Sequence, residues 1–280
     1  MKIIYDHQIF STQNQGGPSR YFIELIKELI LLNNEPIVVA PINQNIHLKQ
    51  ISSNYKKSFF MDIKKKNYLT KIYNDLSSSY YFNKLKFDLY HHTYYNKSFL
   101  TNKPKIITVY DLIHEKFMKE FTLKNLPKKK IFQNIDHFIC ISNNTKNDLI
   151  KYYNIDEKKI SVTYLASFTH SREVKNISFD KPFFLYVGSR KRYKNFRLLL
   201  QSYSNLDAIK KNFDIICFGG GSFLKEEINY MKELSINPKS IYQISGSDEV
   251  LTSLYKQSEV LIYPSKYEGF GLPLLEAASN

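Results

Sequence analysis

Two glutamates near the end of this 280-residue chain are spaced as a pair of sugar-binding carboxylates. Glu268 is followed by Gly269 and Gly271, and Glu276 comes eight residues after Glu268. Glycine allows a backbone to turn sharply and to approach a ligand closely. A carboxylate can accept hydrogen bonds from two neighbouring hydroxyls, such as those of a ribose or a hexose. We therefore predict a sugar-binding loop; a helix-capping loop with two surface glutamates is the alternative.

Pro273 marks the expected start of the helix that carries Glu276. Proline suits the first helical turn, because its missing N–H needs no partner there. The exposed N–H groups of a helix start attract anions such as phosphate. The segment therefore predicts a strand, a glycine loop and a helix, with Glu268 and Glu276 facing one cavity.

A second stretch is rich in cations. Residues 188–195 read Gly-Ser-Arg-Lys-Arg-Tyr-Lys-Asn and follow the apolar run 183–187. An arginine can bind phosphate oxygens through two N–H groups at once, and a lysine adds a point charge. Four cations at the end of a buried strand predict a site that clamps a diphosphate. A solvated basic loop is the other interpretation.

The elements that must position these loops alternate along the chain. Short apolar runs and longer helical patterns follow one another, which predicts βαβ units with parallel strands. The periodicity is lost over residues 166–181, so we predict an N-terminal domain of residues 1–170 and a C-terminal domain of residues 171–280. A ligand cleft is then expected between the domains, at the carboxyl ends of the strands. The predicted strands are Lys2–Tyr5, Pro36–Ala40, Phe87–His91, Ile106–Tyr110, Phe138–Ile141, Ser161–Leu165, Phe183–Val187, Phe213–Phe218, Ile241–Ile244 and Val260–Tyr263.

The order and spacing of the motifs resemble glycosyltransferase family 4 over the whole chain. The most specific match is residues 264–277, Pro-Ser-Lys-Tyr-Glu-Gly-Phe-Gly-Leu-Pro-Leu-Leu-Glu-Ala, which resembles the Glu-x7-Glu signature of the retaining enzymes. Residues 108–115 and 187–196 resemble bacterial O-antigen mannosyltransferase-like members. The resemblance implies an α/β chain of the GT-B fold, in which two Rossmann-like parallel-sheet domains face each other across a cleft.

The resemblance implies roles at the donor sugar and ribose. Glu268 would contact hydroxyls of the donor sugar as a catalytic residue. The backbone of Gly269, Phe270 and Gly271 would lie beside the sugar and the phosphates, and Glu276 would bind the ribose.

One Arg and one Lys neutralise the donor diphosphate in the family. Lys194 stands at the usual place, six residues after Gly188, whereas Ser189 occupies the usual Arg position. Arg190, one position later, is the predicted clamp, and Arg192 is the alternative.

Two further loops resemble donor-binding segments of the family. Ser245 and Gly246 would meet the nucleobase edge, although a capped helix start explains the same residues. Gly17, in the glycine loop after the first strand, would bring helix-start N–H groups to the donor from the opposite domain; an ordinary βα turn is the alternative.

The acceptor side departs from the family pattern. Tyr110 occupies the position of a histidine that lies beside the reacting sugar in many relatives, Asp111 is retained, and His114 follows four residues after Tyr110. We predict catalytic roles for Asp111 and His114 and acceptor contacts for Tyr110, His92 and Arg20. A structural loop histidine at His114 and a surface arginine at Arg20 are the alternatives.

The predicted reaction transfers mannose or a similar hexose, with retention, from a GDP- or UDP-linked donor. The acceptor would be a hydroxyl of a glycan or a lipid-linked glycan in surface polysaccharide synthesis. No carboxylate nucleophile is evident, which suits a front-face mechanism. Cationic side chains at the diphosphate would make a metal or other cofactor unnecessary. An NDP-sugar epimerase on the same fold and a non-catalytic binding fragment are the alternatives.

The charge is positive and uneven. Residues 1–180 hold 27 Lys and Arg against 16 Asp and Glu, and residues 181–280 hold 13 against 10. A lysine-rich solvated surface is one interpretation; attraction to an anionic acceptor or to a membrane surface is the other. No nucleic-acid motif accompanies the charge, and no apolar run is long enough for a membrane span. The expected location is the cytoplasm, with peripheral contact at the inner face of the membrane.

Cys140 and Cys217, in apolar runs, are predicted to be buried thiols.

The chain stops at Asn280, shortly after Glu276 and without a Gly or Pro that would end the helix. We expect the second domain to lack its C-terminal end, and a product of low stability and low activity.

Overall fold

The computed structural model describes most of the chain as two compact units. One unit contains Met1–Glu115 with Thr122–Tyr164, and the other contains Lys116–Phe121 with Leu165–Asn280. The predicted boundary at residues 170 and 171 lies outside the described residues. The structure describes residues 1–14, 16–48, 51, 59–60, 68–95, 98–117, 128–167, 177–190 and 192–280.

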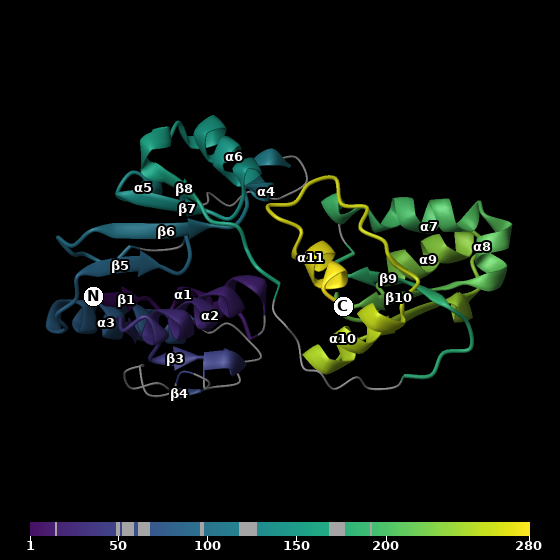
Figure 1. Cartoon of the computed structure of the whole chain (residues 1–280), viewed down its shortest axis with the longest axis horizontal. Coiled ribbons are helices and arrows are strands. Elements are labelled where there is room, and N and C mark those ends of the chain that lie inside the picture. Colours follow the sequence, from purple (N-terminus) through teal and green to yellow (C-terminus); the bar gives the residue numbers. More distant parts are fainter. Residues whose placement is uncertain are drawn as a thin grey trace. The chain divides into compact units, whose positions relative to one another are not determined.

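The first unit is built on a six-stranded sheet in the order β2-β1-β5-β6-β7-β8, in which all pairs are parallel (Figure 1). A separate pair, β3-β4, is also parallel. The predicted α/β class with parallel strands is confirmed. The strands are β1 (Lys2–Tyr5), β2 (Glu35–Val38), β3 (Ile42–Asn43), β4 (Phe59–Phe60), β5 (Leu89–His92), β6 (Lys105–Val109), β7 (His137–Cys140) and β8 (Ile160–Val162).

Helices connect these strands. Ser142 accepts a hydrogen bond from Thr145 N at 3.1 Å and starts α6. That helix ends at Asn154, which has a φ of 53°. Asparagine tolerates this left-handed conformation better than most residues do. The helices are α1 (Gln8–Thr12), α2 (Gly17–Leu31), α3 (Tyr68–Lys84), α4 (Ile113–Lys116), α5 (Lys128–Phe132) and α6 (Asn143–Tyr153).

The second unit has a four-stranded parallel sheet in the order β11-β10-β9-β12. Figure 1 shows α7 and α9 on one side of this sheet and α10 on the other. The strands are β9 (Phe183–Val187), β10 (Asp214–Phe218), β11 (Ile241–Ile244) and β12 (Val260–Leu261). The helices are α7 (Phe196–Ser204), α8 (Asp207–Asn212), α9 (Lys225–Glu233), α10 (Asp248–Gln257) and α11 (Leu272–Ala278).

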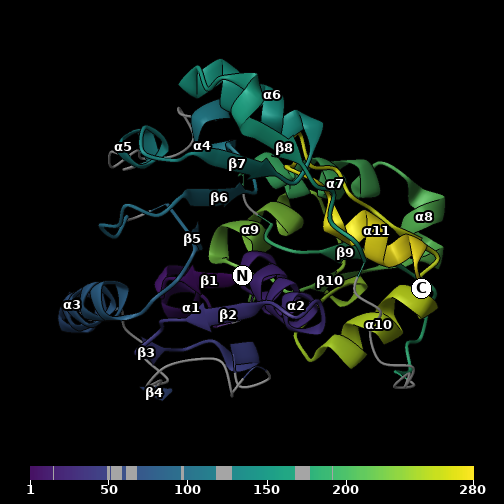
Figure 2. The same ribbon diagram turned by 60° about the vertical axis from the view of Figure 1, so that its left-hand side comes forward.

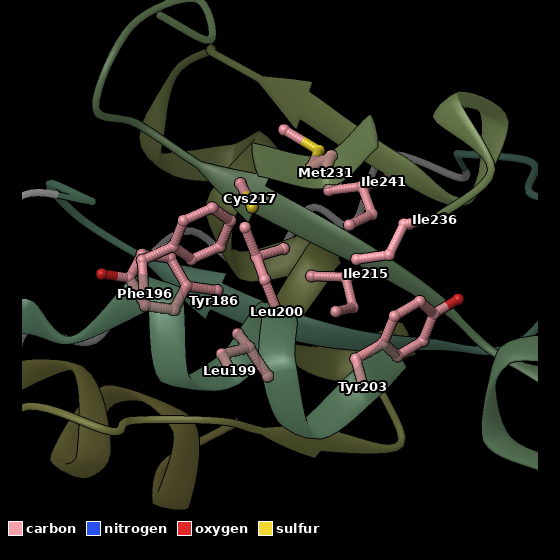
Figure 3. Close-up of a cluster of buried hydrophobic side chains, with 10 residues drawn as sticks. All are labelled: Tyr186, Phe196, Leu199, Leu200, Tyr203, Ile215, Cys217, Met231, Ile236 and Ile241. Atoms are coloured by element: carbon pink, nitrogen blue, oxygen red, sulfur yellow. The ribbon is translucent and has the colours of Figure 1, made fainter. Parts of the chain in front are cut away.

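Strands β9 and β10 are apolar throughout their centres because both faces are covered. Side chains at alternate positions enter opposite cores. Tyr186 and Cys217 pack with α7 and α9 in the cluster of Figure 3, whereas Leu185 and Ile216 pack against α10. Cys140 and Cys217 are both buried and unbridged, as predicted. No helix among the described residues is both long and apolar enough to cross a bilayer.

Strand β5 carries two buried histidines. His92 is fully buried and stacks on the ring of Tyr90 at a centroid distance of 4.0 Å, while Ser98 Oγ lies 3.3 Å from His92 Nε2. These contacts give His92 a place in the core, and its acceptor contact stays a prediction. Burial lowers the pKa of both His91 and His92 to about 3.

We expect the free energy of unfolding to decrease as the pH falls below 6.5. Unfolded histidine binds a proton near pH 6.5, whereas buried His91 and His92 stay neutral down to about pH 3. The unfolded state then binds more protons, and each histidine costs about 2 kcal/mol of stability between pH 6.5 and 5. Urea unfolding at both pH values measures this loss. His92→Phe keeps a ring on Tyr90 and is expected to reduce the loss by about 2 kcal/mol; an unchanged loss would contradict the assignment.

Candidate functional site

The two motifs predicted to bind the donor meet at one edge of the second sheet. Strand β12 pairs in parallel with β9, so that Val260 lies opposite Phe184 and Leu261 lies opposite Leu185. The carboxyl ends of neighbouring parallel strands lie at the same edge. The loop after β9 carries Lys194, and the loop after β12 carries Glu268.

Three hydrogen bonds hold these loops together. Lys194 Nζ lies 2.6 Å from Glu268 Oε1. Lys266 N donates to Tyr193 O at 2.8 Å, and Asn195 Nδ2 donates to Pro264 O at 3.3 Å. Segments whose bonded residues are 69 to 74 positions apart in the chain are therefore joined, and two of the three links use backbone atoms.

The ion pair lies in a largely covered environment. The side chains of Lys194 and Glu268 are 16% and 19% exposed. Lys194 Nζ lies 5.4 Å from the centre of the Tyr263 ring. Burial and the neighbouring Glu268 carboxylate raise the pKa of Tyr263, which keeps its hydroxyl protonated as a donor to Glu268. Because water screens such a site poorly, a phosphate that approached Lys194 would feel its charge strongly.

A tyrosine hydroxyl contacts the carboxylate of Glu276. Glu276 lies on α11, is 7% exposed, and accepts a hydrogen bond from Tyr255 Oη at 2.9 Å. Burial and Glu276 itself raise the pKa of Tyr255, so this hydroxyl also stays a donor. Gly271, with a φ of 91°, precedes α11, and Pro273 stands in its first turn as predicted. That Glu268 and Glu276 face one cavity stays a prediction.

Arg190 makes several hydrogen bonds within the second unit. Its side chain is 2% exposed, and Nε lies 3.0 Å from Glu227 Oε1. Nη1 donates to Gly219 O at 3.1 Å, and Nη2 donates to Gly221 O at 2.8 Å. The guanidinium thus joins the loop after β10 to the loop after β9, and its role as the diphosphate clamp stays a prediction.

Both candidate arginines, Arg190 and Arg192, line a cavity of about 570 Å³. The other residues that line it are Asn195, Phe196, Arg197, Leu200, Glu226, Glu227, Tyr230 and Lys266. Lys194 does not line it. Lys194 is therefore the cation of the basic loop that the structure brings to Glu268.

The predicted base-binding residues lie at the neighbouring strand end. Ser245 and Gly246 follow β11, and Ser245 Oγ accepts a hydrogen bond from Gln243 Nε2 at 2.9 Å. Gly219 N donates to Ile244 O at 3.0 Å, which joins this loop to the loop after β10. Ser247 is the N-cap of α10 but its side chain makes no capping hydrogen bond. The capping explanation for this sequence is thereby weakened.

The first unit places its predicted residues in different environments. Gly17 begins α2 and is exposed, and Arg20 is half-buried one turn later. Tyr110 is 8% exposed, its ring lies 5.6 Å from that of Tyr21, and its hydroxyl donates to Pro18 O at 3.4 Å. Tyr110 is thus largely buried, and its acceptor contact stays a prediction.

Asp111 and His114 lie where the chain leaves β6. Asp111 Oδ1 accepts a hydrogen bond from Ile113 N at 3.1 Å at the start of α4, and burial raises the pKa of Asp111. His114 is half-buried in the same helix. Both remain candidates for contact with a substrate.

Several positioning residues were missed from the sequence. Glu115 accepts a hydrogen bond from Tyr153 Oη at 2.5 Å and pairs with Lys128, which is 3% exposed, at 3.1 Å. Glu227 pairs with Arg190 and also accepts from Leu224 N at 2.7 Å at the start of α9. Because the N-cap of α9 is Leu224 and not Ser, Thr, Asp or Asn, the usual capping-box pattern does not mark Glu227 in the sequence. The partners of Glu115 come from distant segments and leave no local signal.

In the part of the chain that the structure describes, no three His, Cys, Asp or Glu residues are grouped as they would be to hold a metal ion.

Comparison with known proteins decides the family. Residues 15–166 match the family model described as Glycosyltransferase Family 4, and residues 167–280 match the model described as Glycosyl transferases group 1. The chain belongs to glycosyltransferase family 4. Its resemblance to this family in the order of motifs is thereby confirmed.

Two bacterial proteins illustrate the similarity of this family 4 member to curated relatives. The O-antigen chain mannosyltransferase RfbU of Salmonella typhimurium is 29% identical over 183 residues, which cover 62% of this chain and 49% of that protein. The O-antigen chain mannosyltransferase B of Escherichia coli is 35% identical over 97 residues, which cover 34% of this chain and 26% of that protein. The chain thus spans about half the length, or less, of these relatives.

Solved structures confirm the GT-B fold of this family 4 member. The lipopolysaccharide outer core galactosyltransferase WaaB, in its apo form, matches 100% of this chain and 78% of its own with a TM-score of 0.63 and 20% identity. WaaG, a glycosyltransferase involved in lipopolysaccharide biosynthesis, matches 99% of this chain and 78% of its own with a TM-score of 0.70 and 13% identity.

Gly220→Ala is expected to destabilise this family 4 member more than Gly221→Ala does. Both glycines have positive φ, 71° and 73°, which costs an alanine about 1 kcal/mol. A Cβ at Gly220 would lie 2.8 Å from Arg190 Nη1 and from Gly188 O, whereas nothing lies within 4 Å of one at Gly221. Denaturant unfolding should therefore show about 2 kcal/mol of additional loss for Gly220→Ala. Equal losses would mean that Arg190 does not depend on this close approach.

Proposed function

We propose that this chain transfers a hexose, mannose in the first instance, from a nucleoside-diphosphate donor with retention of configuration. The acceptor is a hydroxyl of a glycan or a lipid-linked glycan in surface polysaccharide synthesis. The observation that carries the proposal is the Lys194–Glu268 pair at 2.6 Å, set beside the Gly269–Gly271 loop. The two relatives described above are both O-antigen chain mannosyltransferases, which supports mannose as the sugar and surface polysaccharide synthesis as the pathway.

Lys194 is the proposed cation for the leaving diphosphate. Negative charge grows on that group as the sugar–phosphate bond breaks, and a fixed ammonium in a covered site stabilises it. In the unliganded site, Glu268 neutralises Lys194. When a diphosphate pairs with the Lys194 ammonium in place of Glu268, the Glu268 carboxylate can accept hydrogen bonds from hydroxyls of the donor sugar. The Tyr263 hydroxyl continues to donate to Glu268.

The remaining donor contacts follow the neighbouring strand ends. The backbone of Gly269, Phe270 and Gly271 lies beside the sugar and the phosphates in this proposal. Glu276 binds the ribose hydroxyls while Tyr255 fixes the orientation of its carboxylate. Ser245 and Gly246 meet the base through their backbone. Gly17 supplies backbone N–H groups from the first unit.

Asp111, His114 and Arg20 are the proposed residues of the acceptor side. In this proposal the Asp111 carboxyl orients the acceptor hydroxyl through a hydrogen bond and does not take its proton; burial raises the pKa of Asp111. With Lys194 placed at the diphosphate, charge neutralisation needs no divalent metal in this proposal. The leaving phosphate oxygen takes the acceptor proton on the face from which it departs, as in a front-face retaining reaction.

We expect Lys194→Met to lower kcat/KM for the donor by roughly 100- to 1000-fold, because it removes charge stabilisation of the leaving group. GDP-mannose and UDP-glucose are tested as donors with a lipid-linked glycan acceptor, and NMR of the product gives the anomeric configuration. Lys256→Met on α10, at an exposed position, is the matched control and should be unchanged.

Three outcomes would count against the proposed function. Donor conversion without any acceptor would indicate an epimerase, and donor binding without turnover would indicate a non-catalytic module. Equal losses of kcat/KM in Lys194→Met and Lys256→Met would show that Lys194 has no specific role at the donor site.

Tyr255→Phe is expected to raise KM for the donor about tenfold and to leave kcat nearly unchanged. Loss of one hydrogen bond to a carboxylate costs about 1.5 kcal/mol. A ribose contact is made equally in the ground state and in the transition state, so the loss appears in KM. Tyr164→Phe, at a tyrosine that is 61% exposed in the first unit, is the control. A fall in kcat with unchanged KM would place Glu276 at the reacting centre instead.

A further inference from the structure

Helix α3 carries a row of exposed apolar side chains on its outer side, whereas Phe82 near its end is buried. Leu69 and Leu76 are 69% and 67% exposed, and Tyr80 is 56% exposed. Residues spaced by three, four, seven and eleven positions share one face of a helix. Figure 2 shows α3 at the outer edge of the first unit. The outer face of α3 consists of Leu69, Ile72, Tyr73, Leu76 and Tyr80, with Tyr68 at its start.

The opposite face of α3 is held inward by specific polar contacts. Asn74 is 1% exposed; its Nδ2 donates to Ile42 O at 2.8 Å and to Ser11 Oγ at 3.0 Å, and its Oδ1 accepts from Ile42 N at 2.8 Å. The next residue, Asp75, pairs with His7 at 3.2 Å. These contacts fix the rotation of the helix about its axis. The exposed leucines therefore follow from a defined packing arrangement.

The segment around α3 is strongly basic. Residues 63–86 contain six lysines and one acidic residue, Asp75, which is turned toward His7. Of these lysines, Lys71, Lys84 and Lys86 are exposed. An apolar face with tyrosines and flanking lysines is the pattern of a helix that lies in a membrane interface. Tyrosine rings are amphipathic and prefer the headgroup level, and lysines there are attracted to anionic lipids.

A second copy of the chain is a less suitable occupant. Two such faces in contact would bring the lysines of both copies together, and the acidic residue of this segment is already paired with His7. Like charges across an interface oppose association. An anionic bilayer offers apolar contacts to the outer face of α3 and lipid phosphates to the neighbouring lysines.

We propose that the outer face of α3 docks the protein on an anionic phospholipid surface. The leucines and Ile72 enter the boundary between headgroups and acyl chains, the tyrosine rings lie at the headgroups, and the lysines meet lipid phosphates. The inference is independent of the reaction proposed above, since it depends on a surface that contains none of the residues assigned to donor or acceptor.

Flotation of the full chain with vesicles tests the proposal. Vesicles of phosphatidylglycerol mixed with phosphatidylcholine are compared with vesicles of phosphatidylcholine alone. The double variant Leu69→Ser/Leu76→Ser removes the centre of the stripe and is expected to weaken binding to the anionic vesicles by about tenfold or more. Added salt should weaken binding of the wild type as well.

The matched control is Leu31→Ser/Leu32→Ser in the same unit, because these leucines are 73% and 70% exposed. Its binding should equal that of the wild type, and circular dichroism confirms that both variants are folded. Equal loss in both double variants, or equal binding to both kinds of vesicle, would overturn the proposal. A wild-type dimer that the α3 variant dissociates, without vesicle binding, would assign the face to a second copy instead.

Discussion

The contact between Lys194 and Glu268 is the constraint on which the second unit depends. Each charge is mostly removed from water, and such a charge is tolerated only with a partner in good geometry. The parallel pairing of β9 with β12 and the Tyr193–Lys266 backbone hydrogen bond provide that geometry. A diphosphate that competes for Lys194 would replace one anionic partner with another, so that the lysine remains paired while Glu268 changes its partner.

Arg190 shows why the same loop cannot be interpreted from its charges alone. Arg190 and Lys194 stand four residues apart, yet the arginine turns inward to Glu227 and to carbonyls of the Gly219–Gly221 segment. All three glycines of that segment have positive φ. This conformation turns two of their carbonyl oxygens toward the guanidinium. The arginine thus fixes the loop, and substituting it would test folding before it tested ligand binding.

The sequence predicted what local pattern determines. Strands β1, β9 and β11 have the predicted bounds. For β1 and β9 the reason is a mostly apolar run inside a parallel sheet, whereas β11 is an edge strand in which Tyr242 is exposed. The Glu268 loop was found because glycines, proline and carboxylates are close together in the chain. The burial of His92 and Tyr110 was not foreseen, because it depends on neighbouring strands and helices from distant segments. The roles of Tyr255 and Glu115 escaped notice for the same reason.

Helix α3 illustrates a different limit, since its amphipathic pattern does not say which face is inward. A hydrophobic stripe normally packs on the core. Here Asn74 satisfies both backbone groups of Ile42, and a buried amide with all its partners is costly to replace once formed. Turning the leucines inward would leave those backbone groups without hydrogen bonds. The polar contacts therefore keep the outer face of α3 exposed. Exposure of its apolar side chains to water costs free energy, and contact with lipid would remove this cost.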